Sequence, residues 1–249
     1  MRGNGTLDRV GGIAATAGRS ALDLLLPPRC PACREIVDAD GRFCERCFPE
    51  LGFITAPQCA CCGLPFDIDA GPDALCADCA GTERPYTSAR AAFRYEGAAV
   101  PVLLGFKHGG RVHLASVMAA QMLRLFAAAA VDIIVPVPLD RTRLRTRGYN
   151  QAGLIARALG KRTGLPVAVD GLKRVKPTKS TAGLSRAGRF RAAQGAFAGQ
   201  RNRVGNRRVL LVDDVMTTGA TVESAARALR RSGRAADVRV VTFARALST

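Results

Sequence analysis

Aromatic residues are scarce in this 249-residue chain, which has no tryptophan and three tyrosines. A protein that binds single-stranded nucleic acid by base stacking needs exposed aromatic side chains. The basic stretch of the chain, from Arg141 to Arg208, offers only Tyr149, Phe190 and Phe197 for stacking. Binding of single-stranded DNA is therefore one hypothesis for the function of that stretch, but its low aromatic content argues against base stacking.

Four other absences narrow the possible functions further. No run of 18 apolar residues exists, so no transmembrane helix is expected. Arg19 and Asp23 interrupt the apolar part of the N-terminal segment, which argues against a secretion signal. The phosphate loop GxxxxGK[ST] is missing, which argues against a nucleoside triphosphatase. The only histidines, His108 and His113, show no pairing with a carboxylate, so histidine catalysis is not expected.

Cysteine and charge divide the chain at nearly the same place. All nine cysteines lie between Cys30 and Cys79. Residues 1–90 carry a net charge of −3 and residues 91–249 a net charge of +20, which together give the overall +17. Between Arg141 and Arg208 there are 18 basic residues and one acid, Asp170. Such a field attracts polyanions, whether nucleic acid, an anionic membrane or a small polyphosphate.

Eight of the cysteines form four Cys-x-x-Cys pairs: Cys30/Cys33, Cys44/Cys47, Cys59/Cys62 and Cys76/Cys79. Two such pairs complete one tetrahedral Zn²⁺ site, so the spacing predicts two structural zinc ions. One zinc site, or redox or iron–sulfur chemistry, is the alternative. Cys61 is interpreted as a thiol that ligates nothing. Thiol pairs without a secretion signal indicate the reducing cytoplasm.

The second half of the chain alternates strand and helix patterns, which predicts an α/β fold with a parallel sheet. We expect strands at 131–137, 167–169, 209–212 and 238–243, a strand and hairpin at 89–95, helices at 13–26, 98–126 (broken around 108–110), 151–163 and 221–231, and a loop at 177–195.

Residues 209–221 read VLLVDDVMTTGAT, a buried strand followed by two acids and a turn that opens a helix. A helix N-terminus favours a phosphate, and the turn residues Thr217, Thr218, Gly219, Ala220 and Thr221 are the candidates that hold it. Asp213 and Asp214 are placed to accept hydrogen bonds from ribose hydroxyls. The pattern predicts a ribose 5-phosphate site at the carboxyl edge of the sheet.

Residues 131–152 read VDIIVPVPLDRTRLRTRGYNQA, again a strand that leads into a polar segment. Arg141, Arg143, Arg145 and Arg147 alternate, which would put their guanidinium groups on one side of an extended loop. Forked guanidinium groups bind phosphate oxygens well. The alternative is a solvated arginine face. Lys107 is a further candidate for substrate binding, with a surface lysine as the equal alternative.

The segment VLLVDDVMTTGAT closely resembles the signature of type I phosphoribosyltransferases. Together with LLLPPRCPAC, FKHGGR, PVPL, RGYNQA and GAF, it makes residues 20–247 similar to the ComF family of competence-associated proteins. Arg189 matches this family's pattern, whereas Thr181 and Ala192 depart from it.

This resemblance implies a double zinc ribbon followed by a type I phosphoribosyltransferase-like sheet. We expect an N-terminal tail and short helix at 1–26, the ribbon at 27–85 and the phosphoribosyltransferase-like domain at 86–249. The substrate implied is phosphoribosyl pyrophosphate with Mg²⁺, with Asp213 and Asp214 as the catalytic pair and Arg143 and Arg147 on the leaving pyrophosphate. The pathway implied is DNA uptake and natural transformation, with single-stranded DNA and a competence helicase as partners. A non-catalytic nucleotide-sensing or DNA-binding adaptor on the same fold is the rival reading.

Overall fold

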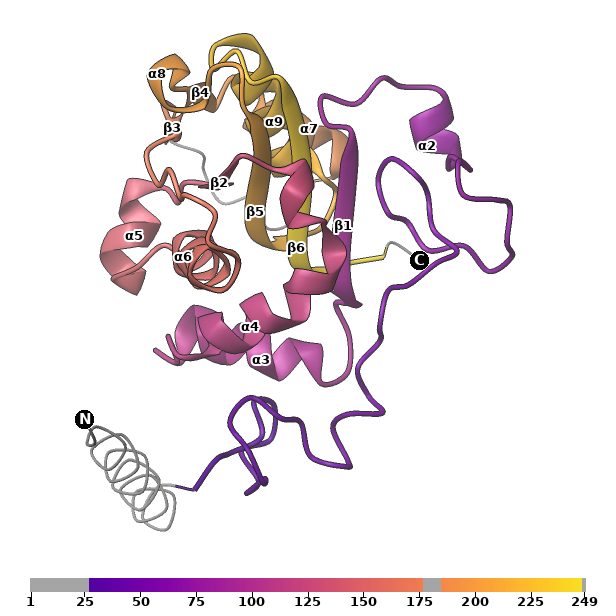
Figure 1. The fold of residues 1–249 in the computed structure, drawn as a ribbon, viewed down its shortest axis with the longest axis vertical. Helices are drawn as coiled ribbons and strands as arrows, with labels where there is room; N and C mark the ends of the chain where they lie inside the picture. Colours follow the sequence, from indigo (N-terminus) through magenta and orange to yellow (C-terminus); the bar gives the residue numbers. More distant parts are fainter. Residues whose placement is uncertain (1–26, 177–184, 248–249) are drawn as a thin grey trace, which may run out of the picture.

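The computed structural model describes residues 27–176 and 185–247, and a four-stranded parallel sheet lies at its centre (Figure 1). The strand order is β1-β6-β5-β2. The bounds are Ser88–Arg94 for β1, Ile133–Pro136 for β2, Arg208–Met216 for β5 and Asp237–Arg245 for β6. An isolated bridge between Ile134 and Val167 adds one more contact beside β2. The predicted parallel sheet is confirmed.

The central strands are buried on both faces because their side chains alternate between two apolar clusters. Leu210 and Val212 of β5 point into one cluster, and Val209 and Leu211 point into the other. Strands that are covered on both sides read as continuous apolar runs, which is why the sequence identified β5 so readily.

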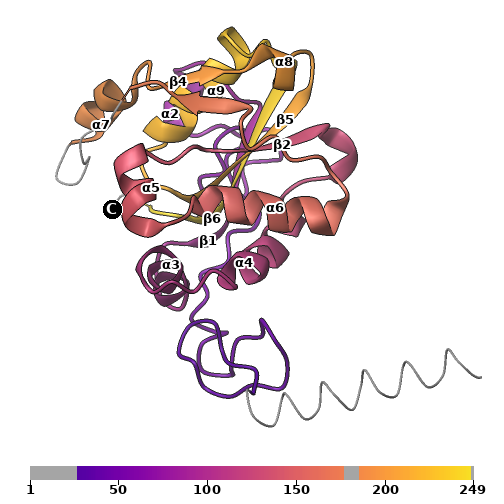
Figure 2. The same cartoon turned by 90° about the vertical axis from the view of Figure 1, so that its left-hand side faces the viewer.

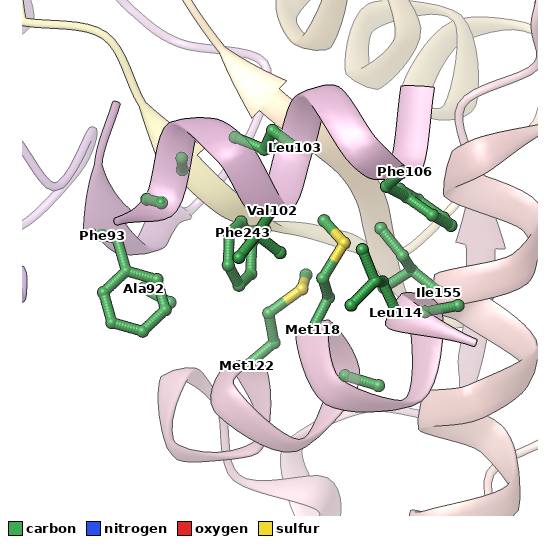
Figure 3. Close-up of a cluster of buried hydrophobic side chains, with 14 of the residues drawn as sticks. Ala92, Phe93, Val102, Leu103, Phe106, Leu114, Met118, Met122, Ile155 and Phe243 are labelled. Carbon is green, nitrogen blue, oxygen red and sulfur yellow. The ribbon is translucent and has the colours of Figure 1, made fainter. Parts of the chain in front are cut away.

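The first face is covered by α3 (Ala99–His108), α4 (Leu114–Met122) and α6 (Gln151–Thr163). Figure 3 shows Phe106 of α3, Met118 of α4 and Ile155 of α6 meeting in this cluster, and each is fully buried. Burying one such side chain stabilises the fold by about 2–3 kcal/mol. The chain between α4 and β2 forms two short 3₁₀ turns, Leu123–Leu125 and Ala128–Ala130.

The second face is covered by α9 (Ala220–Arg231), whose apolar stripe is buried and consists of Val222, Ala225, Ala226 and Leu229. A small antiparallel sheet of β3 (Leu172–Arg174) and β4 (Phe197–Gly199) lies beside α9, with α7 (Arg186–Ala193) and α8 (Arg201–Val204) on either side of β4 in sequence. The sheet thus separates two layers of helices, as a doubly covered parallel sheet requires.

Four local predictions are corrected. The strand at 89–95 pairs in parallel with β6 and forms no hairpin. Residues 167–169 make one bridge and no strand. The expected loop at 177–195 contains helix α7, which Ser185 caps by accepting from the Gly188 backbone N–H. β5 runs to Met216, so the two acids lie within the strand and do not follow it.

The cysteine-rich segment lies against the β1 side of the molecule. Its first part lies below α3 and α4 in Figure 2, and its short helix α2 (Ala77–Ala80) lies beside β1 in Figure 1. Ile54 donates its backbone N–H to the Ala92 carbonyl, which joins this segment to β1. The predicted helix at 13–26 and tail at 1–12 lie outside the described residues. Within the described part, no helix has the length and apolar character needed to cross a bilayer.

Candidate functional site

A cavity of about 200 Å³ opens at the carboxyl end of β5. Its walls come from α3, the chain after β2, the arginine segment at 141–147, the start of α6, β3, α7, β4, the end of β5 and the start of α9. It gathers nine of the predicted site residues: Lys107, Arg143, Arg147, Asp213, Asp214, Thr217, Thr218, Ala220 and Thr221. Residues from three separate segments of the sequence therefore share one small, polar volume.

The two acids enter this cavity from opposite faces of β5. Asp214 lies on the α3 face, where its Oδ2 is 3.2 Å from the Lys107 Nζ. Asp213 lies on the other face and accepts the Asp214 backbone N–H through its Oδ1 at 2.9 Å. The pair therefore presents carboxylate oxygens to both sides of a ligand placed over the strand end.

Asp213 is held in an unfavourable environment for a charge. Burial raises the pKa of its carboxyl to about 7, and the neighbouring Asp214 adds to the effect, while Lys107 and Arg174 oppose it. Hydrogen bonds from hydroxyl groups, or a nearby cation, would stabilise the charged form of such a buried carboxylate. Such perturbed groups concentrate at functional sites, although structural networks also produce them.

The loop between β5 and α9 leads directly into a helix N-terminus. Gly219 is the N-cap of α9 with φ of +82°, a conformation that L side chains rarely adopt. Gly219 itself does not line the cavity, but its turn directs Ala220 and Thr221 of the first helical turn toward it. The first N–H groups of a helix have no partner within the helix, and the dipole favours a negative charge there.

The arginine segment is a helix, α5 (Arg141–Arg147), and the predicted extended loop is wrong. Asp140 caps this helix by accepting the Thr142 N–H at 2.9 Å, and Gly148 ends it in the left-handed conformation. Residues four apart share a helix face, whereas residues two apart do not. Arg143 and Arg147 therefore both line the cavity, and Arg141 and Arg145 do not.

Other lining residues were missed as site residues by the sequence. Arg174 of β3 stacks its guanidinium 5.0 Å above the Phe197 ring, and burial lowers its pKa. Arg189 of α7 lines the cavity as well. Asn150 occupies the N-cap position of α6, but its side chain makes no capping hydrogen bond and its Nδ2 donates to the Val137 carbonyl. The motifs RGYNQA and GAF signalled Asn150 and Phe197, but no local pattern distinguished Arg174.

The eight paired cysteines form two clusters, Cys30/Cys33/Cys44/Cys47 and Cys59/Cys62/Cys76/Cys79, whose ligand atoms all lie within 4.8 Å of one another. The Cys33 and Cys44 sulfurs are 3.6 Å apart, and the Cys62 and Cys76 sulfurs 3.7 Å. Tetrahedral zinc with bonds of about 2.3 Å separates its sulfurs by about 3.8 Å. Both clusters therefore fit structural zinc, which would cross-link each ribbon.

The ninth thiol, Cys61, is outside both clusters. Its backbone carbonyl accepts the Ala89 N–H at 2.7 Å, which ties the second cluster to β1. Arg90 donates to the Ala60 carbonyl at 2.8 Å in the same region. The cluster is therefore fixed to the sheet by backbone contacts around Cys61.

Known families match both parts of the chain. A double zinc ribbon domain matches residues 21–80, and a phosphoribosyl transferase domain matches residues 100–249. The competence protein ComFC of Bacillus subtilis (strain 168) is 28% identical over 220 residues, which are 84% of this chain and 87% of that protein. The DNA utilization protein YhgH of Escherichia coli (strain K12) is 30% identical over 185 residues, 72% of this chain and 80% of that protein. The solved glutamine phosphoribosylpyrophosphate amidotransferase from Bacillus subtilis aligns with 64% of this chain and 29% of its own, at 22% identity and a TM-score of 0.36.

Proposed function

Because the chain belongs to the ComF family, with a double zinc ribbon and a phosphoribosyltransferase-like domain, we propose that it binds phosphoribosyl pyrophosphate in the cavity at the end of β5. One observation carries the proposal: the same cavity of about 200 Å³ is lined by an acid pair, a helix N-terminus and two arginines of α5. A sugar that bears phosphates at two ends needs all three.

The proposed roles follow from the positions of the side chains. Asp213 and Asp214 accept hydrogen bonds from the 2′- and 3′-hydroxyls of the ribose. The turn at 217–221 holds the 5-phosphate on the N-terminus of α9. Arg143 and Arg147 neutralise the pyrophosphate, which arrives as its Mg²⁺ complex. Lys107 balances the charge of Asp214 until the sugar hydroxyls arrive.

Transfer of the ribosyl phosphate is the reaction that this arrangement would serve. The bond from C1 to the pyrophosphate oxygen breaks, its electron pair leaves with the pyrophosphate, and C1 gains positive charge before an acceptor attacks. Two guanidinium groups at the leaving oxygens stabilise the charge that develops there. The carboxylates below the ring hold it in place while C1 changes geometry.

Binding without turnover is the second candidate, and one observation favours it. Among the described lining residues, Asp213 and Asp214 are the only carboxylates, no histidine or cysteine is present, and both acids are assigned to the ribose. An acceptor that must lose a proton would need another base. As an adaptor, the protein would report ribose phosphate to a partner.

The biological setting proposed here is the handling of imported DNA in the cytoplasm. Relatives are named for competence and for DNA utilization. The charge of +17 suits contact with single-stranded DNA, and a helicase of the uptake machinery is the proposed protein partner. Both contacts would use surfaces outside the cavity.

Calorimetry with Mg²⁺-phosphoribosyl pyrophosphate and with a single-stranded oligonucleotide tests the proposal. Asp213→Asn with Asp214→Asn should abolish binding of the sugar pyrophosphate and leave DNA binding unchanged or stronger. DNA affinity should also fall steeply with salt, because phosphodiester contacts release counterions. A double variant that binds the sugar pyrophosphate as well as wild type would refute the site. Pyrophosphate release with nucleobase acceptors separates the transferase from the adaptor.

A further inference from the structure

An ion pair connects the second cysteine cluster to the proposed phosphate loop. Arg84, five residues after Cys79, reaches the Glu223 carboxylate in the first turn of α9 through its Nη1. The two side chains are 10% and 9% exposed, so water screens this pair only weakly. Arg84 also donates to the Asp78 carbonyl at 3.3 Å, which fixes its guanidinium to the ribbon.

The position of Glu223 is unfavourable for a phosphate site. Its backbone N–H donates to the Gly219 carbonyl at 2.9 Å, and a Cβ placed on Gly219 would lie 3.7 Å from its Oε1. The carboxylate thus lies directly beside the turn that we assign to the 5-phosphate. An uncompensated negative charge there would repel a phosphate dianion through a partly buried medium. Arg84 supplies a compensating charge.

A second contact joins the ribbon to the sheet next to this loop. Arg245, at the end of β6, donates to the Cys62 carbonyl, and its Nη2 lies 3.7 Å from the Cys62 sulfur. A cavity of about 280 Å³ separates the cluster from the loop, and Cys62 and Cys76 line it together with Thr217, Thr218 and Gly219. By contrast, the ion pairs of the first ribbon, Arg42–Asp38 and Arg46–Glu35, join residues within that ribbon.

We propose that Arg84 is a positioning residue for the 5-phosphate: it neutralises Glu223 and makes the second zinc ribbon a part of the sugar phosphate site. This inference rests on the proposed function, because it needs a phosphate on α9. Zinc in the second cluster would stabilise the ribbon that positions Arg84. That zinc ion would therefore support the site without contacting the ligand.

A double-substitution cycle with calorimetry tests this role, using wild type, Arg84→Gln, Glu223→Gln and the variant with both changes. Arg84→Gln should bind ribose 5-phosphate and Mg²⁺-phosphoribosyl pyrophosphate about tenfold more weakly, a usual size for a coupling between neighbouring sites. Glu223→Gln should bind as wild type does, or more tightly. The double variant should return to the level of Glu223→Gln, because no charge then remains to be neutralised.

Three controls separate electrostatics from folding. Zinc analysis should return two ions per chain for every variant. Inorganic pyrophosphate, which contacts only the arginine end of the cavity, should bind Arg84→Gln and wild type equally. Arg42→Gln, which breaks the exposed pair in the first ribbon, should leave binding of all three ligands unchanged.

The outcomes distinguish this inference from the function on which it rests. A double variant as weak as Arg84→Gln would mean that Arg84 only holds the fold, and would overturn the inference. Arg84→Gln that binds ribose 5-phosphate as wild type does would overturn it too. Wild type that binds ribose 5-phosphate but not the pyrophosphate compound would refute the proposed function, and the ribose 5-phosphate arm would still decide the role of Arg84. Wild type that binds neither would refute both.

Discussion

Each end of the parallel sheet has an aspartate paired with a basic side chain, but aspartate pKa values are shifted in opposite directions at the two ends. At the amino end, Asp132 before β2 accepts from Arg208 at the start of β5 at 2.6 Å, and the side chains are 36% and 47% exposed. Hydrogen bonds from Arg208 lower the pKa of Asp132 to about 2. At the carboxyl end, Lys107 and Asp214 are 22% and 12% exposed, and burial raises the pKa of Asp213 to about 7.

This difference shows that burial, more than the presence of a basic partner, decides the direction in which the pKa of an aspartate is shifted. At the amino end the charge is satisfied in water, and the pair adds little beyond local order. At the carboxyl end the charges are placed where solvent cannot stabilise them, and the fold bears a cost there. We interpret that cost as preorganisation for a charged ligand, since it is concentrated in the one cavity that gathers the predicted residues.

The largest expected effect contrasts the two cysteine clusters, of which only the second adjoins the loop at the carboxyl end. Cys59→Ser should lose one zinc and reduce binding of phosphoribosyl pyrophosphate by about a hundredfold or more, because structural zinc supplies the folding free energy of its ribbon. Cys30→Ser should lose the other zinc and keep binding within about threefold. Metal analysis measures the zinc content and calorimetry measures the affinity. Equal losses of affinity in the two variants would show that the second cluster has no special role in binding.

A smaller effect contrasts the two ion pairs. Lys107→Met leaves Asp214 buried without its cation and should lower the free energy of unfolding by about 3 kcal/mol. Arg208→Met at the amino end should lower it by clearly less than Lys107→Met does, because that pair is exposed. Urea unfolding at pH 7 compares the two variants. A larger loss of stability from Arg208→Met than from Lys107→Met would contradict the interpretation that the buried pair is the one on which stability depends.

The pH dependence of stability should have opposite signs at the two ends. Asp213 has a folded pKa raised above its unfolded value near 3.8, so its ionisation destabilises the native state progressively from about pH 4 to pH 7. Asp213→Asn should therefore stabilise the ligand-free protein by about 2 kcal/mol at pH 8 and have little effect at pH 4.

Asp132→Asn is the matched control. Its folded pKa is depressed, so its stabilising contribution is present above pH 4 and lost as the pH falls toward 2. This variant should be less stable than wild type at pH 7 and converge with it at low pH. Denaturant unfolding between pH 3 and pH 8 measures both profiles, and parallel profiles for the two variants would contradict the assignment of Asp213 as a buried carboxyl.

The smallest effect contrasts two glycines. Gly219 before α9 has φ of +82°, and Gly164 after α6 has φ of +74°, with no heavy atom within 4 Å of an added Cβ at Gly164. Gly219→Ala and Gly164→Ala should each cost about 1 kcal/mol of stability through backbone strain. Only Gly219→Ala should also weaken ribose 5-phosphate binding, which calorimetry would detect. Weaker binding by Gly164→Ala would show that general destabilisation explains both.

Much of the sheet could be predicted from local patterns because each buried strand is a short apolar run bounded by polar residues. The bounds of α6 were predicted correctly, since its apolar residues recur at helical spacing. The Arg141–Arg147 segment was mispredicted because alternation of arginine and other residues has no apolar face to identify a helix. Its cap, Asp140, and its terminal Gly148 were the signals that indicated a helix.

The sequence by itself determined the two cysteine clusters, the parallel sheet and the turn before α9, because each depends on a pattern within a short segment. The pairing of cysteines into two clusters followed from four adjacent turns. Only the tertiary structure brought Arg174 to Asp213 and Arg84 to Glu223, residues that are 39 and 139 positions apart. Burial is a property of the whole fold, so the raised pKa of Asp213 and the screening of the Arg84 ion pair could be decided only by the packing of distant segments around them.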